Sequence, residues 1–286
     1  MSIPCISWEQ AVLVLRADPD RKEFVKACYL DDPLLVAAQR FECSDEWQAV
    51  RQLLAGRRGQ ALDLGAGRGI ASYALAVDGW GVQAVEPDPS SIVGSGAIRR
   101  LAEESGLPLQ VTQAGAEALP FADGSIDMVY GRQVFHHLSS LGQACAELRR
   151  VLKPGGLVLA TREHVIRREA DRAAFLAAHL THPWTLSENA YRLTTYLAAF
   201  RSAGLHVVSV LRPLDSPINY APMTLAEWRL ECIRPLVQVI GWRRTLSLAS
   251  GRTRWGRLLV ALGAVRQRHA RYEPGASFTI IAERSA

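Results

Sequence analysis

The sequence predicts an α/β protein built on a doubly wound, mostly parallel sheet. Three observations carry this prediction: a glycine-rich turn directly after an apolar segment, an alternation of strand-like and helix-like segments over residues 60–160, and a large apolar content. Alternating segments favour parallel strand pairing with helices on both faces of the sheet. Of the 286 residues, 49% are hydrophobic, which is enough to bury a full core in one domain with appendages.

The segment ALDLGAGRG, residues 61–69, predicts a buried strand, a glycine-rich turn and then a helix over 70–77. Glycines at positions 65, 67 and 69 carry no Cβ atom, so a ligand can lie directly on the main chain at the carboxyl end of the strand. A dinucleotide fingerprint places its third glycine five residues after the first, whereas position 70 is Ile here. The spacing therefore disfavours a nicotinamide-dependent oxidoreductase.

An acidic residue follows the second predicted strand, Val82–Val85. This residue, Glu86, lies 23 positions beyond Asp63. At that point of a βαβ unit, a carboxylate accepts hydrogen bonds from the two hydroxyls of a ribose. The spacing predicts a nucleoside site, the alternative being a surface carboxylate in a turn.

Four blocks of the chain resemble, in order, those of class I S-adenosylmethionine-dependent methyltransferases. The blocks are DLGAGRG from Asp63, AVEPD from Ala84, GAEALPFADGSIDMVYGRQVFHHL from Gly115 and ELRRVLKPGGLVL from Glu147. The resemblance covers residues 58–161 closely and the last strand loosely. It implies a seven-stranded Rossmann-like methyltransferase fold, S-adenosylmethionine as the cofactor, and methyl transfer to a small-molecule or a lipid- or sugar-linked acceptor. The alternative is a noncatalytic S-adenosylmethionine-binding or scaffold protein of the same fold.

The resemblance also implies which residues hold the cofactor. The glycine-rich turn and the end of the fourth strand would hold the methionine part, the acid after the second strand the ribose, and a short turn after the third strand the adenine. The implied cofactor-binding residues are Asp63, Gly65, Ala66, Gly67, Gly69, Glu86, Pro87, Ala116, Glu117, Gly131, Arg132 and Gln133.

The remaining core segments follow from local patterns. An apolar run predicts the fourth strand over 125–130, and LVLAT predicts the next over 157–161. Between them, the Lys153-Pro154-Gly155-Gly156 run is expected to stop a helix as an architectural turn. Later strands are predicted at 206–211 and 278–283, and they pair antiparallel in the resembling fold.

Residues 1–57 are expected to form an N-terminal helical cap. Ser7 with Gln10 forms a capping-box pattern, Ser44 is placed to cap another helix, and Pro33 suits a first helical turn. Such a cap either packs on the edge of the sheet or helps to shape an acceptor pocket. Among its aromatic residues Tyr29 is the candidate acceptor contact, with burial in the core as the alternative.

The acceptor should bind beside the carboxyl end of the fifth strand. There His164 is a candidate general base, and His137 a second candidate catalytic residue, because histidine exchanges protons near neutral pH. A base matters only for a hydroxyl or similar acceptor, since positioning supplies much of the rate. The further candidate acceptor contacts are Glu163, Glu188 and Tyr191. No metal is expected.

A helical insertion is predicted before the last strand. From Arg229 to Tyr272 there are ten arginines and one acidic residue, Glu231, although the whole chain carries only +5. This charge indicates a solvated face on a structural cap, a lid that grips an anionic acceptor, or a surface for peripheral contact with an anionic membrane across Arg229–Arg271. Nucleic acid is not expected, because no RNA-binding motif accompanies the arginines. The predicted division is 1–57 helical cap, 58–212 cofactor-binding core, 213–273 basic insertion and 274–286 final strand.

The compartment is predicted from cysteine usage. Five scattered cysteines with no CxxC pair suit a reducing compartment and neither a disulfide framework nor a zinc site. The amino terminus shows no signal-peptide pattern, and the apolar stretches near the C-terminus fall short of the ~20 residues of a membrane span. A cytoplasmic location is expected, and the oligomeric state is left open.

Overall fold

The computed structural model describes residues 5–269 and 273–285. Its centre is a sheet in the order β3-β2-β1-β4-β5-β8-β7, with a short strand β6 that pairs only with β5. The strands are β1 Gln60–Leu64, β2 Gly81–Val85, β3 Leu109–Thr112, β4 Ile126–Arg132, β5 Leu152–Ile166, β6 Tyr191–Arg192, β7 Leu205–Leu211 and β8 Ala276–Arg284. Pairing is parallel except along β8, which is antiparallel to both β5 and β7. The predicted seven-stranded α/β fold is confirmed, with β6 as an addition.

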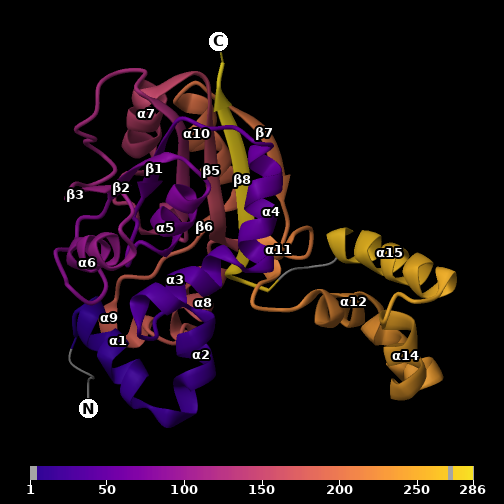
Figure 1. The fold of residues 1–286 in the computed structure, drawn as a ribbon. Coiled ribbons are helices and arrows are strands. Elements are labelled where there is room, and N and C mark those ends of the chain that lie inside the picture. Colours follow the sequence, from indigo (N-terminus) through magenta and orange to yellow (C-terminus); the bar gives the residue numbers. More distant parts are fainter. Residues whose placement is uncertain (1–4, 270–272, 286) are drawn as a thin grey trace.

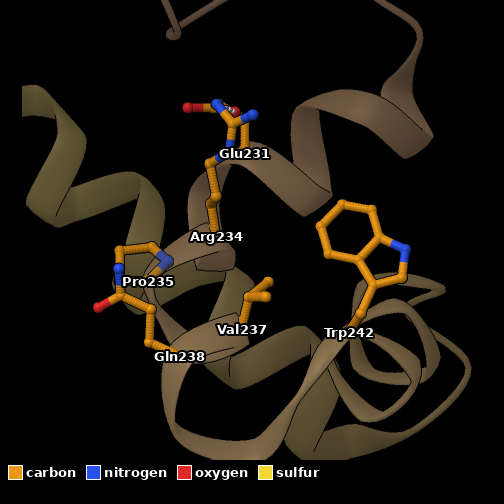
Figure 2. Close-up of a pocket in the computed structure, with 6 residues that line it drawn as sticks. All are labelled: Glu231, Arg234, Pro235, Val237, Gln238 and Trp242. Atoms are coloured by element: carbon orange, nitrogen blue, oxygen red, sulfur yellow. Dashed lines mark hydrogen bonds and ion pairs between the residues drawn. The ribbon is translucent and has the colours of Figure 1, made fainter.

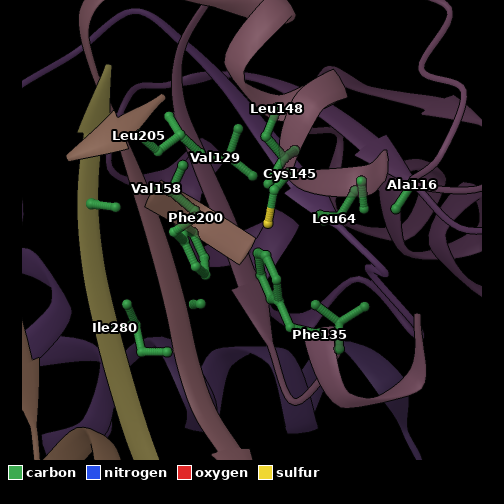
Figure 3. Packing of buried hydrophobic residues seen from close by; sticks show 14 of the residues in the cluster. Leu64, Ala116, Val129, Phe135, Cys145, Leu148, Val158, Phe200, Leu205 and Ile280 are labelled. Carbon is green, nitrogen blue, oxygen red and sulfur yellow. The ribbon is translucent and has the colours of Figure 1, made fainter. Parts of the chain in front are cut away.

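Helices cover both faces of this sheet (Figure 1). Alternate side chains along each strand point to opposite faces: in β5, Leu157 and Leu159 join one core cluster, and Val158 and Ala160 join the other. The first cluster packs against α3 Leu34–Glu42, α4 Asp45–Leu54 and α5 Ile70–Val77. The second packs against α7 Leu141–Val151 and α10 Leu193–Ser202 (Figure 3). The helix α6 Ser95–Ser105 lies beside β2 and β3.

The N-terminal helices begin where the sequence predicts, with one exception. Ser7 and Gln10 form the capping box of α1 Trp8–Ala17, and Ser44 caps α4. Pro33 is the N-cap residue of α3 rather than its first helical residue. Its backbone is extended, and its side chain offers no cap hydrogen bond. Between α1 and α3 lie η1 Pro19–Arg21 and α2 Lys22–Ala27.

The strand β5 is longer than the five residues predicted. Helix α7 ends at Val151 as expected, but the Lys153-Pro154-Gly155-Gly156 run lies inside β5 rather than in a separate turn. Leu152 pairs with Ile126, and the register then shifts before Met128 pairs with Leu157. A bulge in the ladder thus accommodates the residues that the sequence assigned to a turn.

A group of small helices crosses the carboxyl end of the parallel strands. It contains η2 Phe135–His137, α8 Asp171–Ala178 and α9 His182–Thr185. The N-terminal segment joins them, because the Ile6 N–H donates to the Trp184 carbonyl. Figure 1 shows α1, α2, α8 and α9 together at this end of the molecule.

The segment between β7 and β8 forms a helical projection. After α11 Pro217–Tyr220 come α12 Leu225–Ile233, η3 Arg234–Leu236, α13 Val237–Ile240, α14 Trp242–Ala249 and α15 Arg254–His269. Thr224 and Glu227 form the predicted capping box of α12. The helices α12, α14 and α15 extend away from the sheet (Figure 1) and share a small core of Cys232, Ile233, Ala249 and Val260. Arg271, the end of the predicted basic segment, lies outside the described residues.

A hollow of ≈ 420 Å³ lies within this projection (Figure 2). Its lining consists of Glu231, Arg234, Pro235, Val237, Gln238 and Trp242. None of these residues comes from the sheet, so the hollow is separate from the carboxyl ends of the strands. Within the described part of the chain, no helix has both the length and the apolar character of a membrane span.

Candidate functional site

The sheet topology brings the glycine-rich turn and Glu86 together. In the parallel ladders Leu64 pairs with Val85 and with Gly131, so β1, β2 and β4 end side by side. The Gly67 N–H donates to Glu86 Oε2 over 2.8 Å, and the Asp88 N–H donates to Oε1 over 2.9 Å. Burial raises the pKa of Glu86, and these two donors oppose the rise. The buried carboxylate is thus held beside the turn at the edge where ligands bind in such sheets.

The turn itself requires glycine and leaves room above it. Gly65, Gly67 and Gly69 have φ values of 60°, 54° and 82°, in the left-handed region. A Cβ atom on Gly65 would lie 2.3 Å from Val134 Cγ2, whereas one on Gly67 would meet only the Val93 carbonyl oxygen at 3.9 Å. The space over Gly67, next to the Glu86 carboxylate, fits a ligand that lies on main chain and offers hydroxyl groups to an acid. We call Gly65–Gly69 with Glu86 the cofactor half of the site.

Two of the predicted cofactor residues are buried in or beside the glycine turn and hold it in place through hydrogen bonds. Asp63 is buried and accepts a hydrogen bond from Ser72 Oγ over 2.5 Å, which ties β1 to α5. Burial raises the pKa of Asp63 to about 7, against the effect of that hydrogen bond. The buried Ala66 donates its N–H to the Val85 carbonyl over 3.0 Å, whereas Pro87 is exposed. Asp63 therefore ties the turn to α5, and a contact of Asp63 with the cofactor stays a prediction.

The predicted adenine turn is anchored to the start of α7. Glu117 Oε1 accepts a hydrogen bond from Ser139 Oγ over 2.8 Å and another from the Ser140 N–H over 3.1 Å. These donors lower the pKa of Glu117 despite its partial burial, which acts in the opposite direction. Ala116 is buried beside it. The carboxylate of Glu117 thus already has two protein donors, and the part it plays toward an adenine stays a prediction.

At the end of β4, the side chain of Arg132 faces away from the cofactor half. Its guanidinium donates to both oxygens of buried Glu46, over 2.7 and 3.0 Å, and lies over the rings of Tyr29 and Phe41. This ion pair engages the Arg132 side chain and ties β4 to the N-terminal helices, so a contact with the cofactor through the main chain of Arg132 stays a prediction. Gln133 has a φ of 56° and donates its N–H to the Thr161 carbonyl.

Tyr29 belongs to the core rather than to an exposed pocket wall. It is 9% exposed and makes an edge-on contact with Phe41 at a centroid distance of 5.1 Å. Gly131, the first of the three residues at the end of β4, has Phe135 packed so closely that a Cβ atom would lie 2.7 Å from its ring. The alternative given for Tyr29 from the sequence, a core aromatic, is the one that the structure supports.

Glu163 is the clearest departure from the predicted acceptor contacts. It is fully buried, and its carboxylate accepts the N–H groups of Val134, Phe135 and His136 over 3.0 to 3.2 Å. The cause is local: Arg162 has a φ of 59°, and the register against β8 shifts between Ala160 and Glu163. This bulge turns the acid inward, so Glu163 holds the chain after β4 in place and does not contact an acceptor.

A cluster of histidines surrounds Glu188 beside this anchored segment. We call it the histidine cluster; it consists of His136, His137, His164, His179 and Glu188. The Nε2 atoms of His136 and His164 lie 3.6 and 3.9 Å from Glu188 Oε2. Those of His137 and His179 lie 3.8 and 3.9 Å from Oε1. Four imidazoles therefore present the same ring nitrogen to one carboxylate.

The protonation of the two inner histidines follows from their burial. Burial lowers the pKa of His164 to about 4, with the charge of His136 as a further cause. Burial likewise holds the pKa of His136 well below its usual value. Both rings are neutral near pH 7, so each has one ring N–H and one free nitrogen lone pair. His137 is more exposed, and its charge is close enough to lower the pKa of Glu86 against the larger rise caused by burial.

The structure thus unites some predicted residues and adds others. His164, His137 and Glu188, predicted separately, lie together, and the structure adds His136 and His179. The paired histidines at 136 and 137 and the pair at 179 and 182 were the available sequence signal. Their convergence depends on three distant segments meeting. Tyr191 lies on β6 outside the cluster, with the Arg172 guanidinium 5.5 Å from its ring centroid.

The segment that contains the cofactor half is similar to a described family. Residues 62–160, from β1 into β5, match a family model described as a methyltransferase domain. An uncharacterized methyltransferase of Mycobacterium marinum is 37% identical over 142 residues, which cover 49% of this chain and 50% of that protein. A dimethylglycine N-methyltransferase of Parasynechococcus marenigrum is 38% identical over 105 residues, 36% of this chain and 37% of that protein. The matched part of the chain spans half or less of the length of these two curated relatives.

Solved structures extend the likeness to nearly the whole chain. A geranyl diphosphate C-methyltransferase from Streptomyces coelicolor A3(2) aligns over 99% of this chain and 86% of its own, with a TM-score of 0.56 and 14% identity. At that identity the likeness shows the fold alone. The conserved arrangement is the sheet with its covering helices.

Proposed function

From the match of residues 62–160 to a methyltransferase domain, we propose that the protein is a class I S-adenosylmethionine-dependent methyltransferase that acts on a small-molecule or a lipid- or sugar-linked acceptor. The observation that carries the proposal is the cofactor half. There, Glu86 is held beside a glycine turn in which a Cβ atom on Gly67 would make only an ordinary van der Waals contact with the Val93 carbonyl oxygen. The alternative, a noncatalytic protein that only binds the cofactor, shares this half and is separated from the proposal by the assay below.

The residues present fit S-adenosylmethionine. Each Glu86 oxygen accepts one protein N–H, which leaves a further lone pair on each for a ribose hydroxyl. The absent side chain of Gly67 lets a bound group approach the backbone. When bound, S-adenosylmethionine supplies a methyl group on a sulfonium, which an acceptor lone pair attacks. The chain's contribution is to hold both partners in line and to exclude water.

The histidine cluster is the proposed acceptor side. His137 and His164 donate their Nδ1–H groups to the carbonyls of Ser187 and Gly275, over 2.9 Å in each case. A carbonyl oxygen can only accept, so Nε2 of each ring carries the free lone pair in the neutral form. A lone pair held in this way can accept the proton of an acceptor hydroxyl, which supports these two histidines as the catalytic residues.

The chemical class of the acceptor is inferred from the histidines of the site rather than from the names of the relatives. One relative is named for the amine dimethylglycine, and a structural neighbour for the diphosphate of an isoprenoid alcohol. Neither acceptor carries over to a chain that shares only part of the first sequence and only the fold of the second. Because burial lowers the pKa of His164 to about 4, its ring is neutral near pH 7 and suits an acceptor that must lose a proton, such as a hydroxyl.

We propose in addition that α14 and α15 contact an anionic membrane. Trp255, Leu258, Leu262 and Val265 are 72%, 48%, 58% and 53% exposed, and their spacing places them along one face of α15. Exposed arginines accompany them: Arg243 and Arg244 on α14, Arg254 and Arg257 on α15. Apolar side chains beside arginines are typical of helices that lie in the interface of anionic lipid. The hollow of Figure 2 lies in the same projection, and a lid over the acceptor is the competing explanation.

The direct test starts with the purified protein. Mass spectrometry of retained small molecules and calorimetric titration with S-adenosylmethionine are expected to show one cofactor site. A methyl-donor assay with labelled cofactor over hydroxyl, amine and carboxylate acceptors is then expected to label the hydroxyl class. Binding without transfer to any acceptor would favour the noncatalytic alternative, and no binding would contradict both. The cytoplasmic location also stays a proposal, testable by fractionation of cells that express the native chain.

A further inference from the structure

The histidine cluster has the donor set of a metal site. One ligand atom each from His136, His164 and Glu188 lies within 4.8 Å of the other two. A tetrahedral zinc ion holds its ligand atoms roughly 3.3 Å apart, because its bonds to nitrogen are about 2.0 Å long. The three atoms thus need to approach one another by about 1.5 Å at most. Side-chain torsions can supply such a movement.

The outward hydrogen bonds of the rings fix which nitrogen is free. His164 Nδ1 donates to the Gly275 carbonyl over 2.9 Å, and His136 Nδ1 lies 2.7 Å from Glu163 Oε2. Glu163 accepts three backbone N–H groups as well, so we assign the donor of this contact to His136 Nδ1. Histidines that bind metal ions characteristically donate their second ring N–H to a carbonyl or carboxylate in this way. Both Nε2 lone pairs are therefore oriented toward Glu188.

Glu188 lacks the partner that its position demands. Its Oε2 atom is buried and has no hydrogen-bond partner, although the Nε2 atoms of His136 and His164 lie 3.6 and 3.9 Å away. A buried carboxylate oxygen without a donor is costly, since it has lost its hydration. A ring whose Nδ1–H is used in an outward hydrogen bond presents the Nε2 lone pair to this oxygen, and a lone pair cannot donate to it. A cation between the three groups would satisfy the carboxylate and both lone pairs at once.

We propose that His136, His164 and Glu188 bind a divalent transition-metal ion of the zinc class. Two imidazoles favour such an ion over Mg²⁺ or Ca²⁺, which prefer oxygen ligands. Two histidines and one glutamate are three protein ligands, the number found at zinc sites that keep a position open for water or substrate. His137 and His179 face the other oxygen of Glu188 and line that open side.

This site differs from what the sequence predicted. No metal was expected, because the five cysteines lack zinc-binding spacing. The ligands instead come from η2, from β5 and from the segment before β6, which sequence spacing does not relate. The inference does not rest on the proposed function, since it concerns ion binding alone. A bound ion would use the Nε2 lone pair of His164, so in the metal-bound chain the proposed base would be His137.

The experiment measures metal binding by untagged protein after removal of metal with a chelator. Titration calorimetry with Zn²⁺ is expected to give one ion per chain, and Co²⁺ is expected to give visible absorption bands of a low-coordinate nitrogen and oxygen site. Glu188→Gln and His164→Asn should each weaken Zn²⁺ binding by at least ~10²-fold, since even partners outside the ligand set typically contribute 10- to 100-fold. The matched control is His206→Ala, an exposed histidine on β7, which should bind as the native chain does.

Circular dichroism and S-adenosylmethionine titration of the same variants keep the result interpretable. A variant that retains its spectrum and its cofactor affinity but loses Zn²⁺ supports the site. The proposal is wrong if neither Zn²⁺ nor Co²⁺ binds the native chain. It is equally wrong if both folded variants bind as tightly as the native chain does, or if only Mg²⁺ binds. Failure of cofactor binding in the native chain would instead contradict the proposed function and leave the metal result standing.

Discussion

The cofactor half and the histidine cluster meet at one edge of the sheet but are built by different means. The cofactor half uses main chain and one carboxylate, contributed by two neighbouring strands and the turns directly after them. The histidine cluster uses side chains only, from η2, β5 and the segment before β6. A site made of backbone needs a short local pattern, whereas a site made of side chains needs distant segments to converge. The comparison predicts that the two halves fail separately when mutated.

The largest effect should come from the histidine cluster. His164→Ala should lower turnover ~10²- to 10⁴-fold, the usual contribution of a group that moves a proton at the reacting centre. The affinity for S-adenosylmethionine should not change, because the cofactor half is intact. Steady-state kinetics and calorimetry on the same preparation check this, with His206→Ala as the control. Native turnover in His164→Ala would give this histidine a structural role.

The next largest effect is on the free energy of unfolding and comes from Asp63, which is buried next to the cofactor half. The pKa of Asp63 is raised to about 7 from 3.8, chiefly by burial, with the charge of Glu86 acting in the same direction. Between these values the folded chain binds more protons at Asp63 than the unfolded chain does, so stability falls as pH rises from about 4 to about 7. Asp63→Asn should remove this dependence, which amounts to about 4 kcal/mol at most.

Chemical denaturation of both proteins at several pH values checks the Asp63 prediction. The difference in unfolding free energy between Asp63→Asn and the native chain should grow in favour of the variant up to about pH 7 and then level off. Contributions from acids that do not interact with Asp63 cancel in this difference. A constant difference across the range would show that Asp63 titrates as an ordinary carboxyl group.

A smaller effect isolates the cofactor half. Glu86→Ala removes a charged acceptor for the ribose hydroxyls, and each such hydrogen bond contributes about 1.5 to 3 kcal/mol. The expected loss of S-adenosylmethionine affinity is thus at least about tenfold, while Zn²⁺ binding should stay as in the native chain. Glu104→Ala, on the exposed face of α6, is the matched control. Unchanged affinity in folded Glu86→Ala would overturn the ribose assignment.

The smallest effect concerns neither half. Two double variants are compared: one changes both Arg243 and Arg244 to Gln, and the other changes both Arg254 and Arg257 to Gln. Each should weaken binding to anionic vesicles roughly tenfold in a sedimentation assay, because each arginine near the lipid surface contributes up to about 1 kcal/mol. The effect should shrink as salt rises, because salt screens exposed charges. The control pair is Arg57 and Arg58, which are exposed and lie between α4 and β1. If the variants raise the acceptor KM and leave vesicle binding alone, the projection is a lid. If they change neither, it is a structural cap.

The same contrast explains how much was predictable from the sequence. Gly65, Gly67 and Gly69 stand in one short turn, and Glu86 follows the neighbouring strand, so spacing along the chain was enough to place them together. The mostly parallel sheet and the caps at Ser7 and Ser44 were predictable for the same reason: each depends on residues close in sequence or on a common strand and helix pattern.

The errors lie where tertiary structure overrides a local pattern. Glu163 was placed over the site at the carboxyl end of its strand, but the left-handed backbone of Arg162 turns it inward. Arg132 was assigned to the cofactor, and the pairing of its guanidinium with the buried carboxylate of Glu46, 86 positions earlier in the chain, was not predicted. His136 and His179 could not be related to Glu188, since no spacing rule joins η2 to the loop around α9.

The position of β8 in the sheet means that the projection also affects the entropy cost of folding. The strand β8 completes the sheet between β5 and β7, yet residues 212–275 separate it from β7, to which it pairs antiparallel. Such a loop is four doublings longer than a tight turn of about four residues. If it were flexible, its closure would cost about 2.4 kcal/mol more in entropy. Helices α12 and α15 pack on each other through Cys232 and Val260, near the two ends of the projection. Independent folding of this small core would therefore shorten the effective loop, so mutations that loosen it should slow the docking of β8 without touching the sheet.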